Sequence, residues 1–286
     1  MTLWTDLAST PFTLSRIQVG EWSTRVLEAG TGTPLVLMHG TGGHLEAFAR
    51  NVPALAEHFR VIAYDFPGHG RTSLATADLE IADYLEHLAG LLDALRIPRA
   101  HLSGESLGGW VAIKFAAAHP ERVDGLVLNT PGGTMATPEV MERIRSLSQA
   151  AADEPTEERI RTRLEWLMAD PASVTDELVA VRRGIYTRPG FARSMRHVLC
   201  LQDPQVRRRN MVTPDDLSAI KARALVIWTS HDPSGPPSAG VEMAERIPHG
   251  EFRLIDGAGH WPQWERRAEF DQAVLEFLGR RPVSGR

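Results

Sequence analysis

The pentapeptide GESLG at positions 104–108 constrains this chain more than any other part of its sequence. It has the G-x-S-x-G pattern, follows the apolar run Ala100–Gly104 and opens the helical pattern Leu107–Ala118. A serine between a buried strand and a helix lies in a strained turn where backbone and side chains crowd, so small residues are needed around it. The pattern therefore predicts a turn that presents Ser106 as a nucleophile at the end of a strand.

Short apolar runs alternate with helical patterns along most of the chain, which predicts an α/β fold with a mostly parallel central sheet and helices on both faces. The predicted buried strands are Pro34–His39, Arg60–Phe66, Ala100–Gly104, Val123–Asn129, Ala224–Ser230 and Glu251–Ile255. The predicted helices are Glu46–Ala56, Leu79–Leu95, Leu107–Ala118, Ser238–Ile247 and Arg267–Leu278. Two earlier strands, Phe12–Gly20 and Glu21–Gly30, are expected to form a hairpin.

Residues 134–216 break the alternation, because they contain no convincing buried strand and read as several helices separated by prolines. We expect them to form a helical cap on a core made by residues 1–133 and 217–286. Such a cap would cover the carboxyl ends of the strands, where open α/β sheets bind ligands. Within it, Arg182–Arg209 holds eight arginines and one acid. This segment predicts either a solvated basic face or a site where one or two arginines meet an anionic substrate.

A serine hydroxyl needs a base, and the base needs an acid that fixes its tautomer. His260 follows the last predicted strand, and Asp232 follows the strand Ala224–Ser230, which gives the chain order Ser, Asp, His that is typical of the nucleophile turn. Asp256 is the main rival, but it lies four residues before His260 and is expected to cap the loop. We therefore predict Ser106, Asp232 and His260 as the catalytic residues.

The negative charge that develops on the substrate oxygen needs two backbone N–H donors. We expect these to be Leu107, after the nucleophile, and Thr41, in the turn HGTGG at 39–43. No histidine, cysteine or acid cluster has the spacing of zinc ligands, and no G-x-G-x-x-G opens a helix after the first buried strand. The sequence therefore predicts neither a metal nor a cofactor. The glycine-rich segment 65–73 lacks the phosphate-loop spacing and is interpreted as packing near the nucleophile.

Composition bounds the partners and the compartment. The net charge of −5 does not favour nucleic acid binding, and no apolar run approaches the ~20 residues that cross a bilayer. The N-terminus lacks a secretory signal pattern, and the single cysteine, Cys200, leans towards a reducing compartment. We expect a cytoplasmic protein that acts on a small molecule without a nucleic acid or membrane partner.

The motifs HGTGG, DFPGHGRTS, GESLGG and GAGHWPQWE together resemble the α/β-hydrolase superfamily across nearly the whole chain. Within it, the chain looks most like the meta-cleavage product hydrolases, which split a carbon–carbon bond in 2-hydroxy-6-oxo-hexa-2,4-dienoates. Trp261 after the base and the cap stretch Asp170–Arg182 carry the narrower match, together with His44–Asn51 after the oxyanion turn. The resemblance also suggests a possible homodimer.

The resemblance implies several substrate contacts. Arg182 would hold the substrate carboxylate, and Trp261 would line the pocket. The polar contact in the segment after the oxyanion turn would be Asn51 or, by a simple count from His39, Arg50. The remaining expected contacts are Gly40 and Gly42 of the turn and Glu105, which stands where the family often has asparagine.

Two other functions remain open from the sequence alone. A carboxylesterase or lactonase of the same fold would use the same three catalytic residues on an oxygen ester. A ligand-binding receptor would keep the fold and a slow or vestigial site, although nothing in the sequence favours it.

Overall fold

The computed structural model describes residues 3–134 and 137–279. In this part of the chain eight strands form one sheet, in the order β1-β2-β4-β3-β5-β6-β7-β8. Their bounds are β1 Phe12–Val19, β2 Trp22–Ala29, β3 Pro34–Met38, β4 Arg60–Tyr64, β5 Ala100–Glu105, β6 Val123–Asn129, β7 Arg223–Thr229 and β8 Gly250–Ile255. β1, β2 and β4 pair antiparallel, and all pairs from β4 through β3 to β8 are parallel. The predicted parallel sheet with an N-terminal hairpin is confirmed.

Burial explains why the sequence signals for the inner strands are strong. β3, β4 and β6 are buried along nearly their whole length, as continuous apolar runs between two helical layers must be. β1 lies at the sheet edge and is mostly exposed, and it turns into β2 at Gly20, whose φ of 55° suits glycine.

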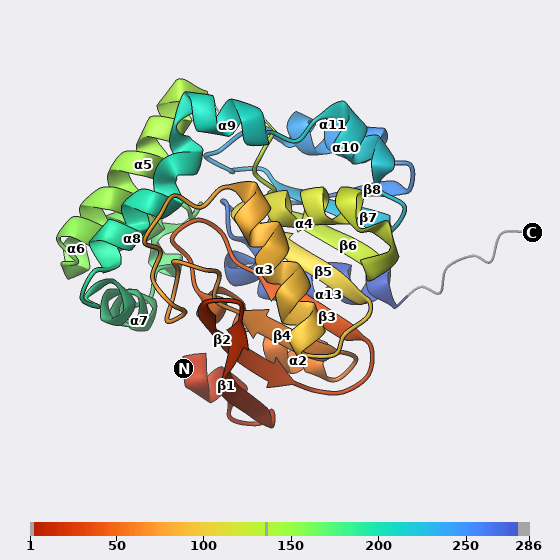
Figure 1. The fold of residues 1–286 in the computed structure, drawn as a ribbon, viewed down its shortest axis with the longest axis horizontal. Helices are drawn as coiled ribbons and strands as arrows, with labels where there is room; N and C mark the ends of the chain where they lie inside the picture. The colour runs from red at the N-terminus through yellow and green to blue at the C-terminus, as the bar shows by residue number, and fades with distance from the viewer. Residues whose placement is uncertain (1–2, 135–136, 280–286) are drawn as a thin grey trace, which may run out of the picture.

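Helices cover both faces of the sheet (Figure 1). The core helices are α1 Leu3–Leu7, α2 Val52–Ala56, α3 Ile81–Ala94, α4 Leu107–Ala118, α11 Pro237–Arg246, α12 Pro262–Glu265 and α13 Arg267–Leu278, with 3₁₀ turns η1 Leu45–Phe48 and η2 Pro120–Arg122. α3 packs against α4 in front of the sheet, whereas α13 packs against α2 behind it.

One predicted helix is wrong in its continuity. The structure divides Glu46–Ala56 into η1 and α2. Pro53 lies in the first turn of α2 and has no N–H with which to continue hydrogen bonds from η1. The short helix α12, directly after Trp261, was not predicted.

The segment between β6 and β7 is helical in the described residues, as predicted. It contains α5 Pro138–Asp153, α6 Glu157–Glu165, η3 Pro171–Ser173, α7 Asp176–Tyr186, α8 Phe191–Val198, η4 Leu199–Gln202, α9 Pro204–Asn210 and α10 Pro214–Ala219. Prolines start four of these elements, because proline needs no N–H in the first helical turn. In Figure 1, α5 to α9 gather on one side of the sheet.

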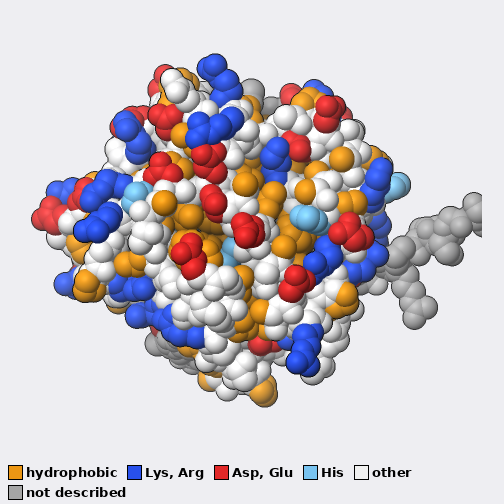
Figure 2. Space-filling view, viewed as in Figure 1, with side chains coloured by type: hydrophobic (Ala, Val, Ile, Leu, Met, Phe, Trp, Pro, Cys, Tyr) orange, Lys and Arg blue, Asp and Glu red, His pale blue; other side chains and the backbone are white. Residues whose placement is uncertain are grey.

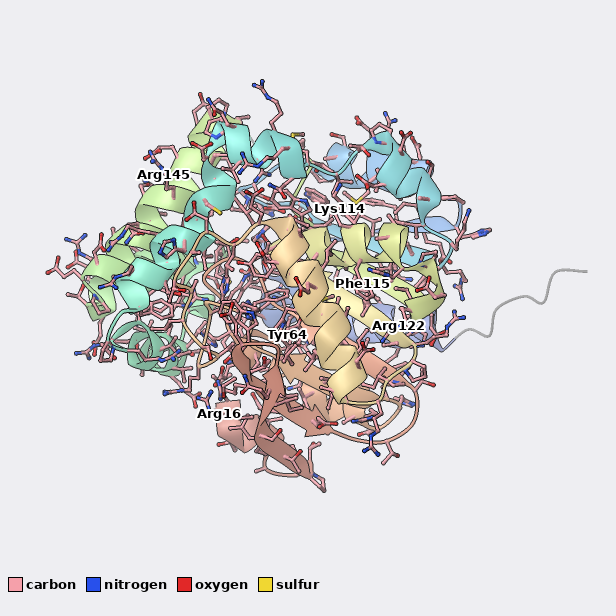
Figure 3. All side chains as sticks on the ribbon, viewed as in Figure 1. Arg16, Tyr64, Lys114, Phe115, Arg122 and Arg145 are labelled. Atoms are coloured by element: carbon pink, nitrogen blue, oxygen red, sulfur yellow. The ribbon has the colours of Figure 1, made fainter. Side chains whose placement is uncertain are left out.

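The last of these helices belongs spatially with the sheet layer. α10 packs on α4 and α11, and an ion pair of 2.9 Å joins Lys114 of α4 to Asp216 of α10 (Figure 3). The division into a core and a cap at residues 134–216 stays a prediction, and its ranges include residues 1–2, 135–136 and 280–286, which lie outside the described part.

Charged side chains of both signs are mixed over the face shown in Figure 2. None of the helices in the described residues is long and apolar enough to span a membrane.

Candidate active site

Ser106 lies in a strained turn between β5 and α4. Its φ of 53° is in the region that side-chain-bearing residues rarely adopt. A Cβ on Gly104 would come within 2.2 Å of the Gly108 backbone, and one on Gly108 within 2.2 Å of the Met38 carbonyl oxygen. The two glycines of the motif are therefore required by close backbone packing, as the sequence predicts.

Backbone hydrogen bonds hold this strained residue in place. The Ser106 N–H donates to the Asn129 carbonyl at 3.1 Å, and its carbonyl accepts from Gly132 at 2.8 Å and from Trp110 at 3.0 Å. Ser106 is consequently fixed from both the next strand and its own helix.

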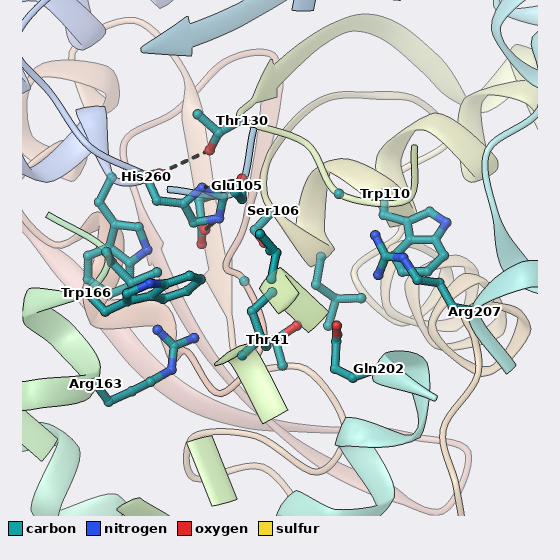
Figure 4. Close-up of a pocket in the computed structure, with 18 residues that line it drawn as sticks. Thr41, Glu105, Ser106, Trp110, Thr130, Arg163, Trp166, Gln202, Arg207 and His260 are labelled. Carbon is teal, nitrogen blue, oxygen red and sulfur yellow. Dashed lines mark hydrogen bonds and ion pairs between the residues drawn. The ribbon is translucent and has the colours of Figure 1, made fainter. Parts of the chain in front are cut away.

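His260 and Asp232 meet at the ends of two neighbouring strands. Asp232 Oδ1 lies 2.9 Å from His260 Nδ1, and it also accepts a hydrogen bond from Ser234 Oγ at 2.7 Å. Burial alone would lower the pKa of His260, but the carboxylates of Asp232 and Glu105 raise it above its ordinary value. Ser106 and His260 line the same cavity (Figure 4). The structure thus brings the three predicted catalytic residues together.

The rival acid points elsewhere. Asp256 is exposed, and a hydrogen bond from Ser230 lowers the pKa of its carboxyl group.

The loop that carries His260 is bound to the helical segment between β6 and β7, because the His260 N–H donates to the Leu167 carbonyl at 2.6 Å. Glu265 accepts hydrogen bonds from the backbone N–H groups of Gly259 at 2.7 Å and Asp170 at 2.9 Å. The acid at the end of the GAGHWPQWE motif therefore joins the His260 loop to the helical segment.

Both predicted oxyanion donors line the cavity. Leu107 is the first residue of α4, so its N–H has no acceptor within the helix. Gly40 and Thr41, on the turn after β3, line the same cavity. Gly42 does not line the cavity, and its carbonyl accepts a hydrogen bond from Tyr186 Oη at 2.8 Å.

Glu105 turns its carboxylate into the site. It is 1% exposed, and its Oε1 lies 3.3 Å from His260 Nε2, the nitrogen on the opposite side of the ring from Asp232. Burial raises the pKa of Glu105, and the charge of His260 opposes that shift most strongly.

The structure places Arg182 behind the cavity wall. Its guanidinium carbon lies 5.4 Å from the centre of the Trp261 ring, and Trp261 lines the cavity. Arg182 is buried, and none of its three guanidinium nitrogens has a hydrogen-bond partner among the described residues. Burial lowers its pKa. Such a buried cation without an acidic partner is costly unless an anion compensates it.

Arg50 and Asn51 are not brought to the cavity. Arg50 pairs with Asp6 at 3.6 Å and lies over the Trp264 ring at 3.8 Å. The Asn51 amide donates to the Gln263 carbonyl at 3.0 Å and to Asp271 at 2.7 Å, so it joins the start of α2 to the C-terminal helices α12 and α13.

Several residues that sequence reasoning missed line the cavity, and six of them are Trp110, Thr130, Arg163, Trp166, Gln202 and Arg207. Arg163 had a signal, because it lies between Ile160 and Leu164 on the buried face of α6. Arg207 had none that separates it from its exposed neighbour Arg208. In the described residues, no group of three or more histidines, cysteines or acids could hold a metal ion.

Known proteins are similar to this chain in sequence and fold over most of its length. The family model described as the alpha/beta hydrolase fold matches residues 33–267. A 2-hydroxy-6-oxononadienedioate/2-hydroxy-6-oxononatrienedioate hydrolase from Burkholderia vietnamiensis is 36% identical over 88% of this chain and 90% of its own length. A 2-hydroxy-6-oxo-6-phenylhexa-2,4-dienoate hydrolase from Comamonas testosteroni is 32% identical over 89% and 90%. The solved meta-cleavage product hydrolase from Pseudomonas fluorescens superposes with a TM-score of 0.81 at 28% identity, over 93% of this chain and 97% of that one.

Proposed function

Because the chain belongs to the α/β-hydrolase family, on the branch of the meta-cleavage product hydrolases, we propose that it is a serine hydrolase that splits a carbon–carbon bond in 2-hydroxy-6-oxo-dienoates. The observation that carries this proposal is one cavity lined by Ser106, His260 and Arg163, whose buried NH1 nitrogen has no hydrogen-bond partner among the described residues. The equally unpaired guanidinium of Arg182 lies behind the Trp261 wall of this cavity. A neutral ester would leave those cations uncompensated.

The proposed chemistry uses the residues already described. Ser106 adds to the carbonyl remote from the substrate carboxylate, and His260, oriented by Asp232, takes its proton. The amides of Leu107 and Thr41 hold the oxyanion. The carbon–carbon bond breaks because the leaving carbanion is delocalised as a dienolate. Water deprotonated by His260 then clears the acyl-enzyme.

We assign the carboxylate end of the substrate to the side of Arg163, Arg182 and Trp261. Arg163 lines the cavity, and its Nε donates a hydrogen bond to Ser148 Oγ at 2.9 Å. Its NH1 nitrogen has no partner among the described residues. A carboxylate placed here would satisfy guanidinium groups whose pKa values burial lowers.

The other end of the cavity favours a second anionic group. Arg207 lies on the opposite side of Ser106 from Arg163 in Figure 4, with its guanidinium 5.0 Å from the centre of the Trp110 ring. Burial lowers the pKa of Arg207, and no carboxylate opposes that shift. Relatives named nonadienedioate hydrolases act, by their names, on dicarboxylates. We therefore assign a dienedioate, with a carboxylate beyond the remote carbonyl, as the preferred substrate.

The test compares dienoates that differ in the remote substituent, carboxyethyl against phenyl, with the cleavage products identified by mass spectrometry. Arg207→Met should lower kcat/KM for the dioate by about 10–100-fold, the loss expected for one charged hydrogen bond, and should change phenyl turnover much less. Arg208→Met, on the exposed neighbour, is the matched control. Equal losses on both substrates would contradict the dioate assignment. Absence of carbon–carbon cleavage products from every dienoate would contradict the function itself.

Ester or lactone hydrolysis is the alternative that shares the catalytic residues. The named relatives favour the carbon–carbon reaction instead. The cytoplasm and a homodimer remain part of the proposal. The single cysteine supports a cytoplasmic location, and the family resemblance supports a homodimer. Light scattering of the purified protein tests the dimer.

A further inference from the structure

The imidazole of His260 lies between two carboxylates. Nδ1 is 2.9 Å from Asp232 Oδ1, and Nε2 is 3.3 Å from Glu105 Oε1. A neutral imidazole carries one N–H and can donate to one carboxylate only. If both contacts are hydrogen bonds, an additional proton must lie on Nε2 or on Glu105.

Packing holds Glu105 in this position. The side chains of Glu105 and Asp232 are 1% and 0% exposed, so two full negative charges here would be strongly disfavoured without a proton between them. A Cβ on Gly40 would come within 2.6 Å of Glu105 Oε2, so the turn after β3 leaves room for this carboxylate by having no side chain.

The electrostatic surroundings favour keeping that proton. Burial raises the pKa of Glu105 against the opposing effects of His260, the Gly40 amide, Arg163 and Arg182. Burial lowers the pKa of His260, and the charge of Arg163 lowers it further. The carboxylates of Asp232 and Glu105 outweigh both effects, so the pKa of His260 is raised. Each partner therefore binds a proton more tightly than it would in water.

This proton blocks the ordinary role of His260. Nε2 has to accept the proton of Ser106, and it cannot do so while it donates to Glu105 or accepts from a protonated Glu105. The extra proton must leave the pair before Ser106 attacks. Dienoate cleavage offers a place for it, because a dienolate has to gain a proton on the carbon beside the remote carbonyl before its carbon–carbon bond can break.

We propose, resting on the proposed carbon–carbon hydrolysis, that Glu105 and His260 share a proton across Nε2 and deliver it to the dienolate carbon before Ser106 attacks. The electron pair of the dienolate forms the new C–H bond, and its enolate oxygen becomes a carbonyl. Glu105 is left as a carboxylate and His260 as a neutral base with a free Nε2. The proton released when water hydrolyses the acyl-enzyme restores the shared pair. Glu105 is thus a catalytic acid that ester hydrolysis does not need.

The first test compares two substrates in Glu105→Gln, which keeps the shape of the side chain and removes its acidic proton. Dienoate cleavage should fall about a hundredfold or more relative to p-nitrophenyl acetate hydrolysis, within the range typical of a lost general acid. The rate of ester hydrolysis should also rise at a lower pH than in the wild type, because the Glu105 charge that raises the pKa of His260 is gone. Asp256→Asn removes an exposed carboxylate near the same loop. This control should change neither the ratio of dienoate cleavage to ester hydrolysis nor the pH at which ester hydrolysis rises.

The second test separates protonation from attack. In heavy water, Ser106→Ala should exchange deuterium into the carbon beside the remote carbonyl of the bound dienoate, as read by mass spectrometry, and Ser106→Ala with Glu105→Gln should not. Glu105→Asp, which keeps an acid, should retain more dienoate cleavage than Glu105→Gln.

The proton-sharing role would be overturned if Glu105→Gln lost equal activity on both substrates and kept the wild-type pH dependence of ester hydrolysis. Undiminished deuterium exchange in Ser106→Ala with Glu105→Gln would also overturn it. If the glutamine variant does not fold, a Glu105→Asn variant, which also lacks the acid, would overturn it by keeping the wild-type pH dependence of ester hydrolysis and the wild-type ratio of dienoate to ester cleavage. A wild-type protein that cleaves no dienoate at all would instead remove the proposed function on which this inference rests.

Discussion

At the scale of single residues, contacts distinguish side chains that the sequence presents as equals. Asp232 and Asp256 both lie on loops near His260, but Asp232 is hydrogen-bonded to the His260 ring, whereas Asp256 is hydrogen-bonded to Ser230. The positions of Ser106, His260 and Asp232 followed from motif context and chain order. The direction in which Arg50 and Asn51 point could not follow, because a count along the chain does not determine which side of a turn faces the cavity.

We predict that Asp232→Asn lowers kcat by orders of magnitude, about 10⁴-fold in the serine protease precedent, because an amide favours the wrong histidine tautomer. Steady-state kinetics with either a dienoate or an ester measures this. Asp256→Asn is the paired variant and should stay close to wild type. A large loss in Asp256→Asn with little in Asp232→Asn would mean that the other carboxylate orients His260.

The arginines show the same limit of sequence reasoning. Of the arginines in the segment 182–209, Arg182 and Arg207 are buried, whereas Arg183, Arg196 and Arg209 form surface ion pairs. The interpretation as a solvated basic face therefore holds for the surface members, and contact with an anionic substrate stays a prediction for the two buried ones. Which arginine turns inward depends on how α7 and α9 pack, and periodicity in short helices does not determine that packing.

At the scale of elements, the junction of β5 and α4 is the most constrained part of the fold. Gly108 sits where α4 crosses the end of β3, and no side chain fits between them. The sequence predicted both elements because a continuous apolar run and a long helix carry strong signals. It missed α12 and the break between η1 and α2, since these elements span only four or five residues.

We expect Gly108→Ala to lower the free energy of unfolding by roughly 1–3 kcal/mol or more through overpacking, because the new Cβ would lie 2.2 Å from the Met38 carbonyl oxygen. Urea unfolding followed by circular dichroism measures the change. Gly184→Ala is the matched control, since its Cβ would meet nothing closer than 3.7 Å at an exposed position of α7, where alanine is the better helix former. Similar stability in both variants would show that the junction is less tightly packed than described.

At the scale of the whole molecule, the sheet could be predicted from alternating patterns, and the cavity could not. The cavity forms where the turn after β3, the β5–α4 junction and the His260 loop meet α5, α6 and α9, and each contributes only one to three residues. Packing of the fold also buries histidines away from the site. Because a buried histidine stays neutral while the unfolded chain takes up its proton, such histidines make the stability of the fold depend on pH.

His87 illustrates this coupling. It is 2% exposed and lies 2.8 Å from Thr24 Oγ1, and burial lowers its pKa to about 3. The unfolded chain takes up this proton near the ordinary value of about 6.5, so stability is lost as the pH falls from there towards 3. His87→Gln should make the plot of unfolding free energy against pH shallower by up to about 1.4 kcal/mol per pH unit in this window. Urea titrations between pH 7 and pH 4 measure the slope, with exposed His58→Gln as control. An unchanged slope in His87→Gln would contradict a buried neutral histidine.

The central claim is that one serine-based site cleaves the carbon–carbon bond of a dienoate. The most direct measurement follows the loss of the visible dienolate absorbance beside p-nitrophenyl acetate hydrolysis, in the wild-type protein and in Ser106→Ala. We predict bleaching that far exceeds ester cleavage in the wild type and is abolished in the variant. Ester cleavage without bleaching would contradict the claim and make the protein an esterase, and bleaching with formation of the cleavage products that survives Ser106→Ala would remove Ser106 as the nucleophile.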